Sequence, residues 1–278
     1  MRLFKIKNSR GQEYDLNDLE NFFHDPSGLG FKRDTDYLKI GNRYIPQDDK
    51  FSQPEISGTI RFKGSEGEAY DKYYEFAKFI QHVPLTLYYT PDLTYRIDVY
   101  VESIDKTEID KKSDGLDCKI KFSGTNLFYR DVIISNDGKA AGKVYPYKYN
   151  YTYNDFIPGT AAIESDSAED SPCRIFIYGK AVNPHWYHYL NGKLVGEGKV
   201  NATIASGDKL VVDSMSMPYL IQETDSDNKL IHDRYQQSDF TMSRFIFLGY
   251  GHNLIAVGHD GTDILKVALE AMILHETV

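Results

Sequence analysis

Apolar and polar residues alternate with a period of two in many short segments of this chain. This alternation is typical of strands that bury one face. It is strictest over residues 95–102 and 116–122, and it also marks residues 2–7, 54–62 and 85–89. The pattern predicts that the first half of the chain is built mainly from short strands.

One segment of the first half has a helical period instead. Its apolar side chains recur three and four residues apart, so they share one helix face; they are Tyr70, Tyr73, Phe76, Ala77 and Ile80. The spacing predicts a helix over residues 68–81. Pro84 follows closely and is expected to prevent its continuation.

The second half of the chain is predicted to consist of strands throughout. Its strand-like segments are residues 174–179, 202–205, 209–213, 244–248, 253–257 and 264–275. Asn191-Gly192 predicts a tight hairpin turn, and Ser206-Gly207-Asp208 is expected to join its flanking strands as a second hairpin. Residues 161–171 are acidic without clear periodicity, so we expect an exposed loop there. Many short strands with frequent turn signals predict a β-sandwich.

The composition becomes small and polar around residues 136–142, which predicts a boundary between two domains. The expected fold class is mainly β. An N-terminal β-sandwich with one α-helix would occupy residues 1–135, and a C-terminal β-sandwich residues 136–278.

The chain of 278 residues carries 32 Lys and Arg against 41 Asp and Glu, a formal charge of −9. A chain with this negative charge lacks the excess of basic residues that is typical of nucleic-acid-binding proteins. It could still lie next to nucleic acid without binding it, because its acidic groups and the phosphates repel each other. Cys118 and Cys173 are too few for a disulfide framework or a zinc site, and we expect two buried thiols. The N-terminus lacks a signal-peptide pattern, and no apolar run is long enough to span a membrane.

Residues 12–50 are rich in aromatic side chains but weak in periodicity. As a surface loop this segment would expose a set of large apolar residues, namely Phe22, Phe23, Leu29, Phe31, Tyr37 and Tyr44. Two interpretations stay open at this point. The set could form an interface with an adjacent copy, or it could cover the sandwich of its own chain.

Candidate chemistry is sparse. His185 and His188 would diverge in an extended segment, and no Cys or carboxylate completes a metal site near them. The acidic residues between Glu102 and Asp110 are expected to form a solvated face, although paired carboxylates could serve a glycosidase. Nucleotide-binding and serine-hydrolase motifs are absent from the sequence. We therefore expect no catalytic residues, no cofactor and no metal.

Sugar binding is the more serious alternative. Trp186 and Tyr187 could stack on a pyranose ring, which would make the second domain a host cell-wall carbohydrate-binding module. Trp186 could equally anchor a core or a domain interface.

The order of several segments is similar to that of distal tail (Dit) proteins of siphophages and prophages of Gram-positive bacteria. In the first half these segments are Asp25–Phe31, Pro54–Phe62, the tyrosine-rich helix and Pro84–Thr90. In the second half, Ser171–Gly179, Val182-Asn183-Pro184 and Gly251–Val257 resemble segments of the galectin-like C-terminal domains of that family.

The resemblance implies a non-enzymatic structural protein of the phage tail tip, assembled in the bacterial cytoplasm. Six N-terminal domains would close into a ring around a DNA channel, either single or stacked with a second ring. The ring would join the tail tube to the tail-associated lysin or fibre, and the galectin-like domains would carry receptor-binding or other baseplate parts. No membrane is implied as a partner.

Overall fold

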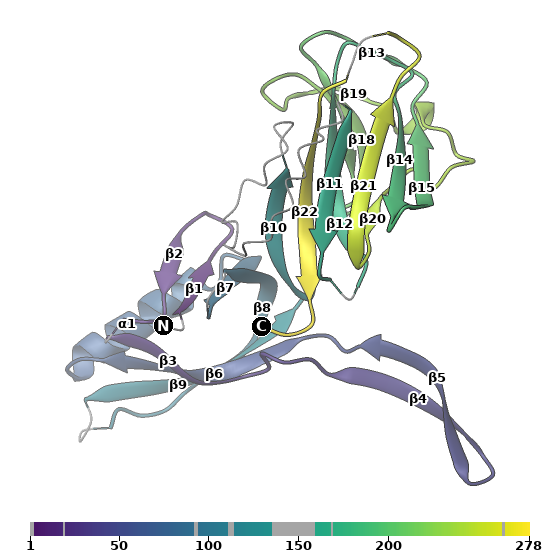
Figure 1. Cartoon of the computed structure of the whole chain (residues 1–278). Coiled ribbons are helices and arrows are strands. Elements are labelled where there is room, and N and C mark those ends of the chain that lie inside the picture. Colours follow the sequence, from purple (N-terminus) through teal and green to yellow (C-terminus); the bar gives the residue numbers. More distant parts are fainter. Residues whose placement is uncertain are drawn as a thin grey trace, which may run out of the picture. The chain divides into compact units, whose positions relative to one another are not determined.

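The computed structural model describes residues 3–18, 20–91, 94–110, 114–134, 159–167, 169–262 and 265–278. Within this part of the chain the structure is predominantly strand with a single α-helix, so the predicted fold class is confirmed. The chain divides into two compact units (Figure 1). Unit 1 comprises residues 1–129 and 275–278, and unit 2 comprises residues 130–274.

Unit 1 is built on one curved sheet. Its strands are β1 (Leu3–Lys7), β2 (Glu13–Asp15), β3 (Asn21–Ser27), β6 (Glu55–Lys63), β7 (Leu85–Thr90), β8 (Tyr95–Lys106) and β9 (Gly115–Gly124). They pair antiparallel in the order β3-β6-β9-β8-β7-β1-β2. Most of these strands follow the predicted alternation.

The segment after β2 connects the two ends of this sheet. The backbone N–H of Leu16 donates to the carbonyl oxygen of Phe4 in β1, at 3.1 Å. The carbonyl of Leu16 in turn accepts a hydrogen bond from the N–H of Phe23 in β3, at 2.9 Å. Backbone groups along this seam are therefore satisfied within the unit, which removes much of an otherwise open strand edge.

Helix α1 (Glu66–Phe79) lies against β6 and β9, and the predicted helix is confirmed with slightly earlier bounds. The carboxylate of Glu68 accepts a hydrogen bond from the backbone N–H of Ser65 at 2.8 Å, as in a capping box. The apolar face of the helix enters the core, where Phe76 packs against Phe62 with ring centroids 5.7 Å apart.

Unit 2 consists of two packed sheets. The first has the order β19-β18-β17-β12-β22-β10, and the second has the order β11-β21-β14-β15. Their bounds are β10 (Phe128–Ile134), β11 (Thr160–Ser165), β12 (Ser171–Tyr178), β14 (His185–Leu190), β15 (Lys193–Lys199), β17 (Lys209–Asp213), β18 (Leu220–Thr224), β19 (Leu230–Asp233), β21 (Gly251–Gly258) and β22 (Val267–His275). Short elements complete the unit, namely β13 (Ala181–Val182), β16 (Thr203–Ile204), β20 (Phe247–Leu248) and the 3-10 helix η1 (Tyr235–Gln237).

The core of unit 2 lies between these sheets. Ile175 and Leu269 enter it from the first sheet, and Trp186 and Ile255 enter it from the second. The Asn191-Gly192 hairpin is confirmed: both residues have positive φ, 50° and 80°, as a type I′ turn requires.

Two expectations for unit 2 are wrong. The acidic segment expected to be a loop contains β11, in which Ala161, Ile163 and Ser165 are buried. Its small and polar buried residues conceal the alternation. The segments around residues 203 and 209 do not pair with each other, because β16 pairs with β13 while β17 pairs with β12 and β18.

The thiols of Cys118 and Cys173 are free and buried, as predicted. Burial raises the pKa of each thiol to about 12, so both are protonated at neutral pH. The small polar segment predicted as a domain boundary, residues 136–142, and the tyrosine-dense residues 145–156 lie outside the described residues.

Candidate subunit interface

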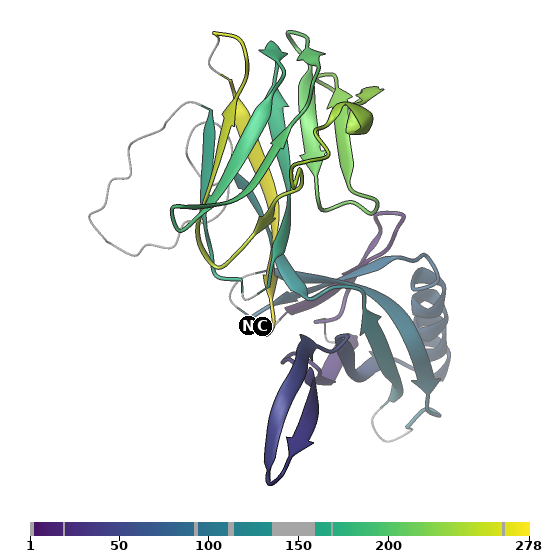
Figure 2. The same ribbon diagram turned by 90° about the vertical axis from the view of Figure 1, so that its right-hand side faces the viewer.

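A long β-hairpin extends from unit 1. It is formed by β4 (Arg33–Ile40) and β5 (Arg43–Phe51), which pair from Arg33 with Phe51 to Ile40 with Arg43. The two strands form a separate two-stranded sheet, and the hairpin projects away from the rest of its unit (Figure 2). A hairpin of two strands is at best marginally stable in water unless it packs against another element.

Polar contacts hold the stem of this hairpin. Arg33 Nη1 donates to Asp49 Oδ2 at 2.7 Å, and Thr35 Oγ1 donates to Asp49 Oδ1 at 2.9 Å. The hydroxyl of Thr35 and the guanidinium of Arg33 hold the pKa of Asp49 below its ordinary value. The same guanidinium lies over the ring of Phe51, 4.1 Å from its centroid. The stem is therefore ordered by its own side chains.

The outer half of the hairpin is different, because it exposes large apolar side chains. We call residues 37–46 the hairpin tip. Its exposed apolar residues are Tyr37, Leu38, Ile40, Tyr44 and Ile45, with Tyr44 exposed to 65%. Exposed apolar groups gathered in one place are typical of surfaces that bind another molecule.

Four of the six aromatic and apolar residues predicted to lie at an interface are exposed, namely Phe22, Phe31, Tyr37 and Tyr44. Leu29 is half-buried against the core of its own unit. Phe23 instead lies within that core, 3% exposed, with its ring 5.0 Å from that of Phe4. A side chain packed in this way is not available to a neighbour. Sequence reasoning missed Leu38, Ile40 and Ile45, although the Gly41-Asn42 turn between apolar residues marks the hairpin.

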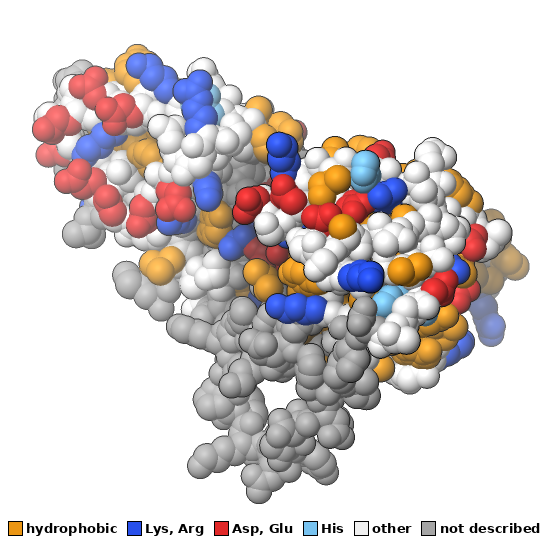
Figure 3. Space-filling model, turned by 90° about the horizontal axis from the view of Figure 1, so that it is seen from above, with side chains coloured by type: hydrophobic (Ala, Val, Ile, Leu, Met, Phe, Trp, Pro, Cys, Tyr) orange, Lys and Arg blue, Asp and Glu red, His pale blue; other side chains and the backbone are white. Residues whose placement is uncertain are grey.

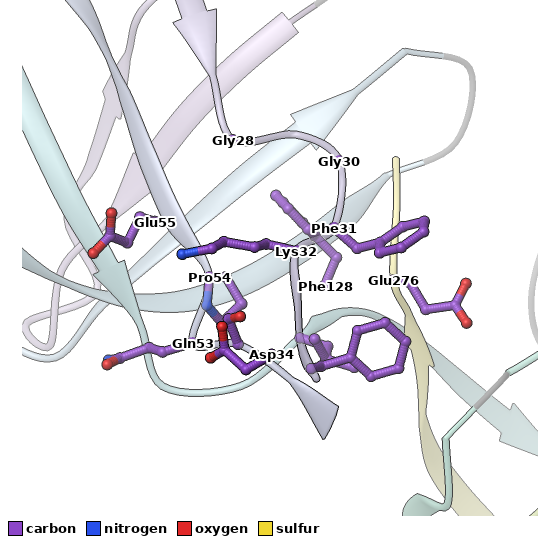
Figure 4. Close-up of a pocket in the computed structure, with 13 residues that line it drawn as sticks. Gly28, Gly30, Phe31, Lys32, Asp34, Gln53, Pro54, Glu55, Phe128 and Glu276 are labelled. Atoms are coloured by element: carbon purple, nitrogen blue, oxygen red, sulfur yellow. The ribbon is translucent and has the colours of Figure 1, made fainter. Parts of the chain in front are cut away.

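A cavity of about 550 Å³ lies at the base of the hairpin (Figure 4). Its apolar wall is formed by Phe31, Phe51, Pro54, Leu127 and Phe128. Its charged lining consists of Lys32, Asp34, Glu55 and Glu276, which is three carboxylates against one ammonium. The cavity combines segments that are distant in sequence, so the sequence alone does not reveal it.

Gly28 shapes this cavity. Its φ is +89°, and a Cβ at this position would lie 1.8 Å from the carbonyl oxygen of Glu55. Only glycine allows so close an approach of the two chain segments. Next to it, the carbonyl of Leu29 accepts a hydrogen bond from the backbone N–H of Val278 at 3.2 Å, which fixes the C-terminal segment beside the cavity.

Trp186 is fully buried in the core of unit 2, and its indole N–H donates to the carbonyl of Arg244 at 2.9 Å. One face of the ring lies against Gly198, where an added Cβ would come within 2.4 Å. Trp186 therefore has no free face for a sugar. Tyr187 points to the opposite side of β14, half-buried, with its ring 5.7 Å from that of His185.

His185 and His188 lie on opposite faces of β14, as an odd spacing in a strand dictates. No cluster of three or more potential metal ligands occurs among the described residues. Of the acidic residues between 102 and 110, Glu102 pairs with Lys121 at 2.9 Å and Glu108 accepts a hydrogen bond from Tyr70 at 2.8 Å. In the described part of the chain, no helix is long and apolar enough to cross a membrane.

These features define a β protein in which strands β4 and β5 expose large apolar side chains. Comparison with known proteins shows what the N-terminal part of the chain is similar to. Residues 3–125 match the model of the distal tail protein N-terminal domain. The resemblance to distal tail proteins that the sequence predicts is therefore confirmed over this part of the chain.

Solved structures share the fold over the whole chain. One is a chain of the phage P2 baseplate in its activated conformation with Ca, at 17% identity, a TM-score of 0.63 and 100% coverage of both chains. Another is the Dit protein of SPP1, described as a paradigm of the hub adsorption apparatus in phages that infect Gram-positive bacteria. That match has 10% identity and a TM-score of 0.66, and covers 97% of this chain and 98% of the other. No curated protein sequence matches the chain.

Proposed function

We propose that this chain is the structural hub of a phage tail tip, and that six copies close into a ring around a DNA channel. The ring joins the tail tube to the tail-associated lysin or fibre and to the receptor-binding apparatus. The β4–β5 hairpin carries this proposal, because its tip is apolar and exposed in a single copy. Packing against an adjacent copy would bury these side chains.

A ring requires a heterologous interface, in which two different surfaces of one copy meet their counterparts on its two neighbours. A hairpin that projects from its own unit is one such surface, since it can reach a neighbour without moving the core. The family match over unit 1 supports the assignment of ring formation to this unit. Unit 2, as a galectin-like sandwich, is then the domain that carries other baseplate parts.

The net negative charge of the chain supports the proposal of a DNA channel. Its formal charge is −9, and acidic side chains gather in one group at the upper left of Figure 3. Acidic groups along a channel repel phosphate, so DNA passes without being held. The hub itself acts as a scaffold and performs no catalysis.

Light scattering coupled to size-exclusion chromatography tests the ring, together with negative-stain images. We expect the wild-type chain to form a sixfold ring, and the Tyr37→Ser/Tyr44→Ser double variant to remain monomeric with unchanged thermal stability. Tyr250→Ser is the matched control, since Tyr250 is 71% exposed on unit 2, and this variant should still form rings. A wild-type chain that stays monomeric at high concentration beside its tail partners would contradict the proposal.

A further inference from the structure

Both faces of the hairpin tip carry large apolar side chains, with Lys39 beside them on one face and Arg43 on the other. Residues that pair across two strands share a face, and so do residues two apart in one strand. The register therefore places Leu38, Ile40 and Ile45 on one face, and Tyr37, Tyr44 and Pro46 on the other. A tip that lay flat on a surface would leave one of these faces in water. A tip that inserts into a cavity buries both.

The tip is also basic. Lys39 and Arg43 are the charged residues between Tyr37 and Pro46. Neither is engaged in an ion pair among the described residues, and Lys39 lies over the ring of Tyr44 with Nζ 5.7 Å from its centroid. The tip thus offers a compact apolar body that carries two positive charges.

The cavity at the base of the hairpin has the complementary character. Aromatic and aliphatic side chains form its body, and Asp34, Glu55 and Glu276 lie at its border. Glu55 has a partner in Lys121 at 3.3 Å, whereas Asp34 and Glu276 have none among the described residues. The hydroxyl of Ser52, also in the lining, is buried without a hydrogen-bond partner in the described structure. Buried polar groups of this kind are normally satisfied by a partner.

The tip cannot enter the cavity of its own chain. Cavity and tip lie at opposite ends of β4, and seven steps of about 3.3 Å separate Arg33 from Ile40, a distance of about 23 Å. The ordered stem holds the two apart. A second copy is therefore the only source of this tip for a given cavity.

We propose that the hairpin tip of one copy docks into the hairpin-base cavity of the next copy, with Lys39 and Arg43 facing Asp34 and Glu276. This inference rests on the proposed ring, and it names the two surfaces that form its repeated contact. Tip and cavity belong to the same chain. Each copy therefore inserts its tip into one neighbour, and its cavity binds the tip of the other neighbour. Such an arrangement continues from copy to copy until rotation closes it.

Disulfide trapping tests this contact. Asn42→Cys places a thiol at the exposed turn of the tip, and Lys32→Cys places one at the cavity while leaving its three carboxylates unchanged. Cys118 and Cys173 are buried, so they are not expected to compete with the introduced thiols. Under oxidised glutathione, the double variant should give a ladder of covalent multimers up to six on a non-reducing gel.

Single variants sharpen the test. A mixture of Asn42→Cys chains with Lys32→Cys chains should give covalent dimers and nothing larger, since each copy then carries half of the contact. Asn42→Cys combined with Asp71→Cys, on the exposed side of α1, is the matched control and should give no ladder. Covalent dimers from Asn42→Cys alone would overturn the inference, because they indicate contact between two tips.

Light scattering on the same samples separates the two proposals. Rings that form without any disulfide in the double variant would overturn the docking of tip into cavity and leave the ring intact. Monomers alone would overturn both. Charge reversal gives an independent readout: Asp34→Lys/Glu276→Lys should abolish rings, and adding Lys39→Glu/Arg43→Glu to the same chain should restore them.

Discussion

Gly28 and Glu55 approach each other so closely that the carbonyl oxygen of Glu55 lies 1.8 Å from where a Cβ of residue 28 would stand. The contact joins the end of β3 to the start of β6 at the edge of the cavity, and a side chain at residue 28 would force these strands apart. The position therefore depends on glycine both for its left-handed backbone and for the space.

We expect Gly28→Ala to lower the free energy of unfolding by about 1–3 kcal/mol or more, as a strained backbone position does. Urea denaturation followed by circular dichroism measures the change. Gly30→Ala is the matched control, because no atom lies within 4 Å of a Cβ there and its φ is not positive. Equal stability of the two variants would contradict this account of Gly28.

Trp186 is the single tryptophan of the chain, so its fluorescence reports on unit 2 alone. We expect Trp186→Phe to retain the fold and Trp186→Ala to cost about 3–5 kcal/mol, because it leaves a large cavity in the core. Denaturation followed by circular dichroism distinguishes these variants. Tyr187→Ala, on the outer face of β14, should cost less. A Trp186→Ala variant that is fully stable but loses glycan binding would instead support the carbohydrate-binding alternative.

His188 makes unit 2 sensitive to pH. Burial disfavours the imidazolium and lowers the pKa of His188, against the smaller opposing effect of its hydrogen bond to Asn253. The unfolded chain therefore binds a proton more readily, so this contribution to stability is complete above about pH 6.5 and declines as pH falls below it. Tryptophan fluorescence in urea, at a series of pH values, measures the decline.

We expect His188→Gln to flatten this pH dependence between pH 5 and 7, since an amide can keep a hydrogen bond to Asn253 without titrating. His232→Gln, at an exposed position of β19 in the same unit, is the matched control for the substitution itself. An identical profile in wild type and His188→Gln would show that another group titrates.

The sequence predicted best where one face of an element enters a core. β9 and α1 were found because burial imposes a period of two or 3.6 on their apolar residues. β11 was missed because its buried positions hold Ala161 and Ser165, which carry little hydrophobic signal. The false hairpin at residues 203–213 shows that adjacency in sequence does not decide strand pairing, which here follows the packing of two sheets.

For the proposed interface residues, too, the sequence predicted one part and only the structure revealed the other. Sequence alone indicated that residues 12–50 hold more aromatic side chains than a surface loop can leave in water. It did not reveal that Phe23 belongs to the core while Tyr37 and Tyr44 lie on a projecting hairpin. Both strands of that hairpin are exposed on both faces, so no burial imposes a regular alternation on them.

By itself, the sequence determined the mainly β class, the single helix, the turn at Asn191-Gly192 and the resemblance to distal tail proteins, since each depends on local order along the chain. Only the tertiary structure decided which aromatic residues are exposed, and it alone brought residues 28–34, 51–55, 127–128 and 276 together around one cavity. The physical reason is that burial and cavity shape arise from contacts between distant segments, which local periodicity does not encode.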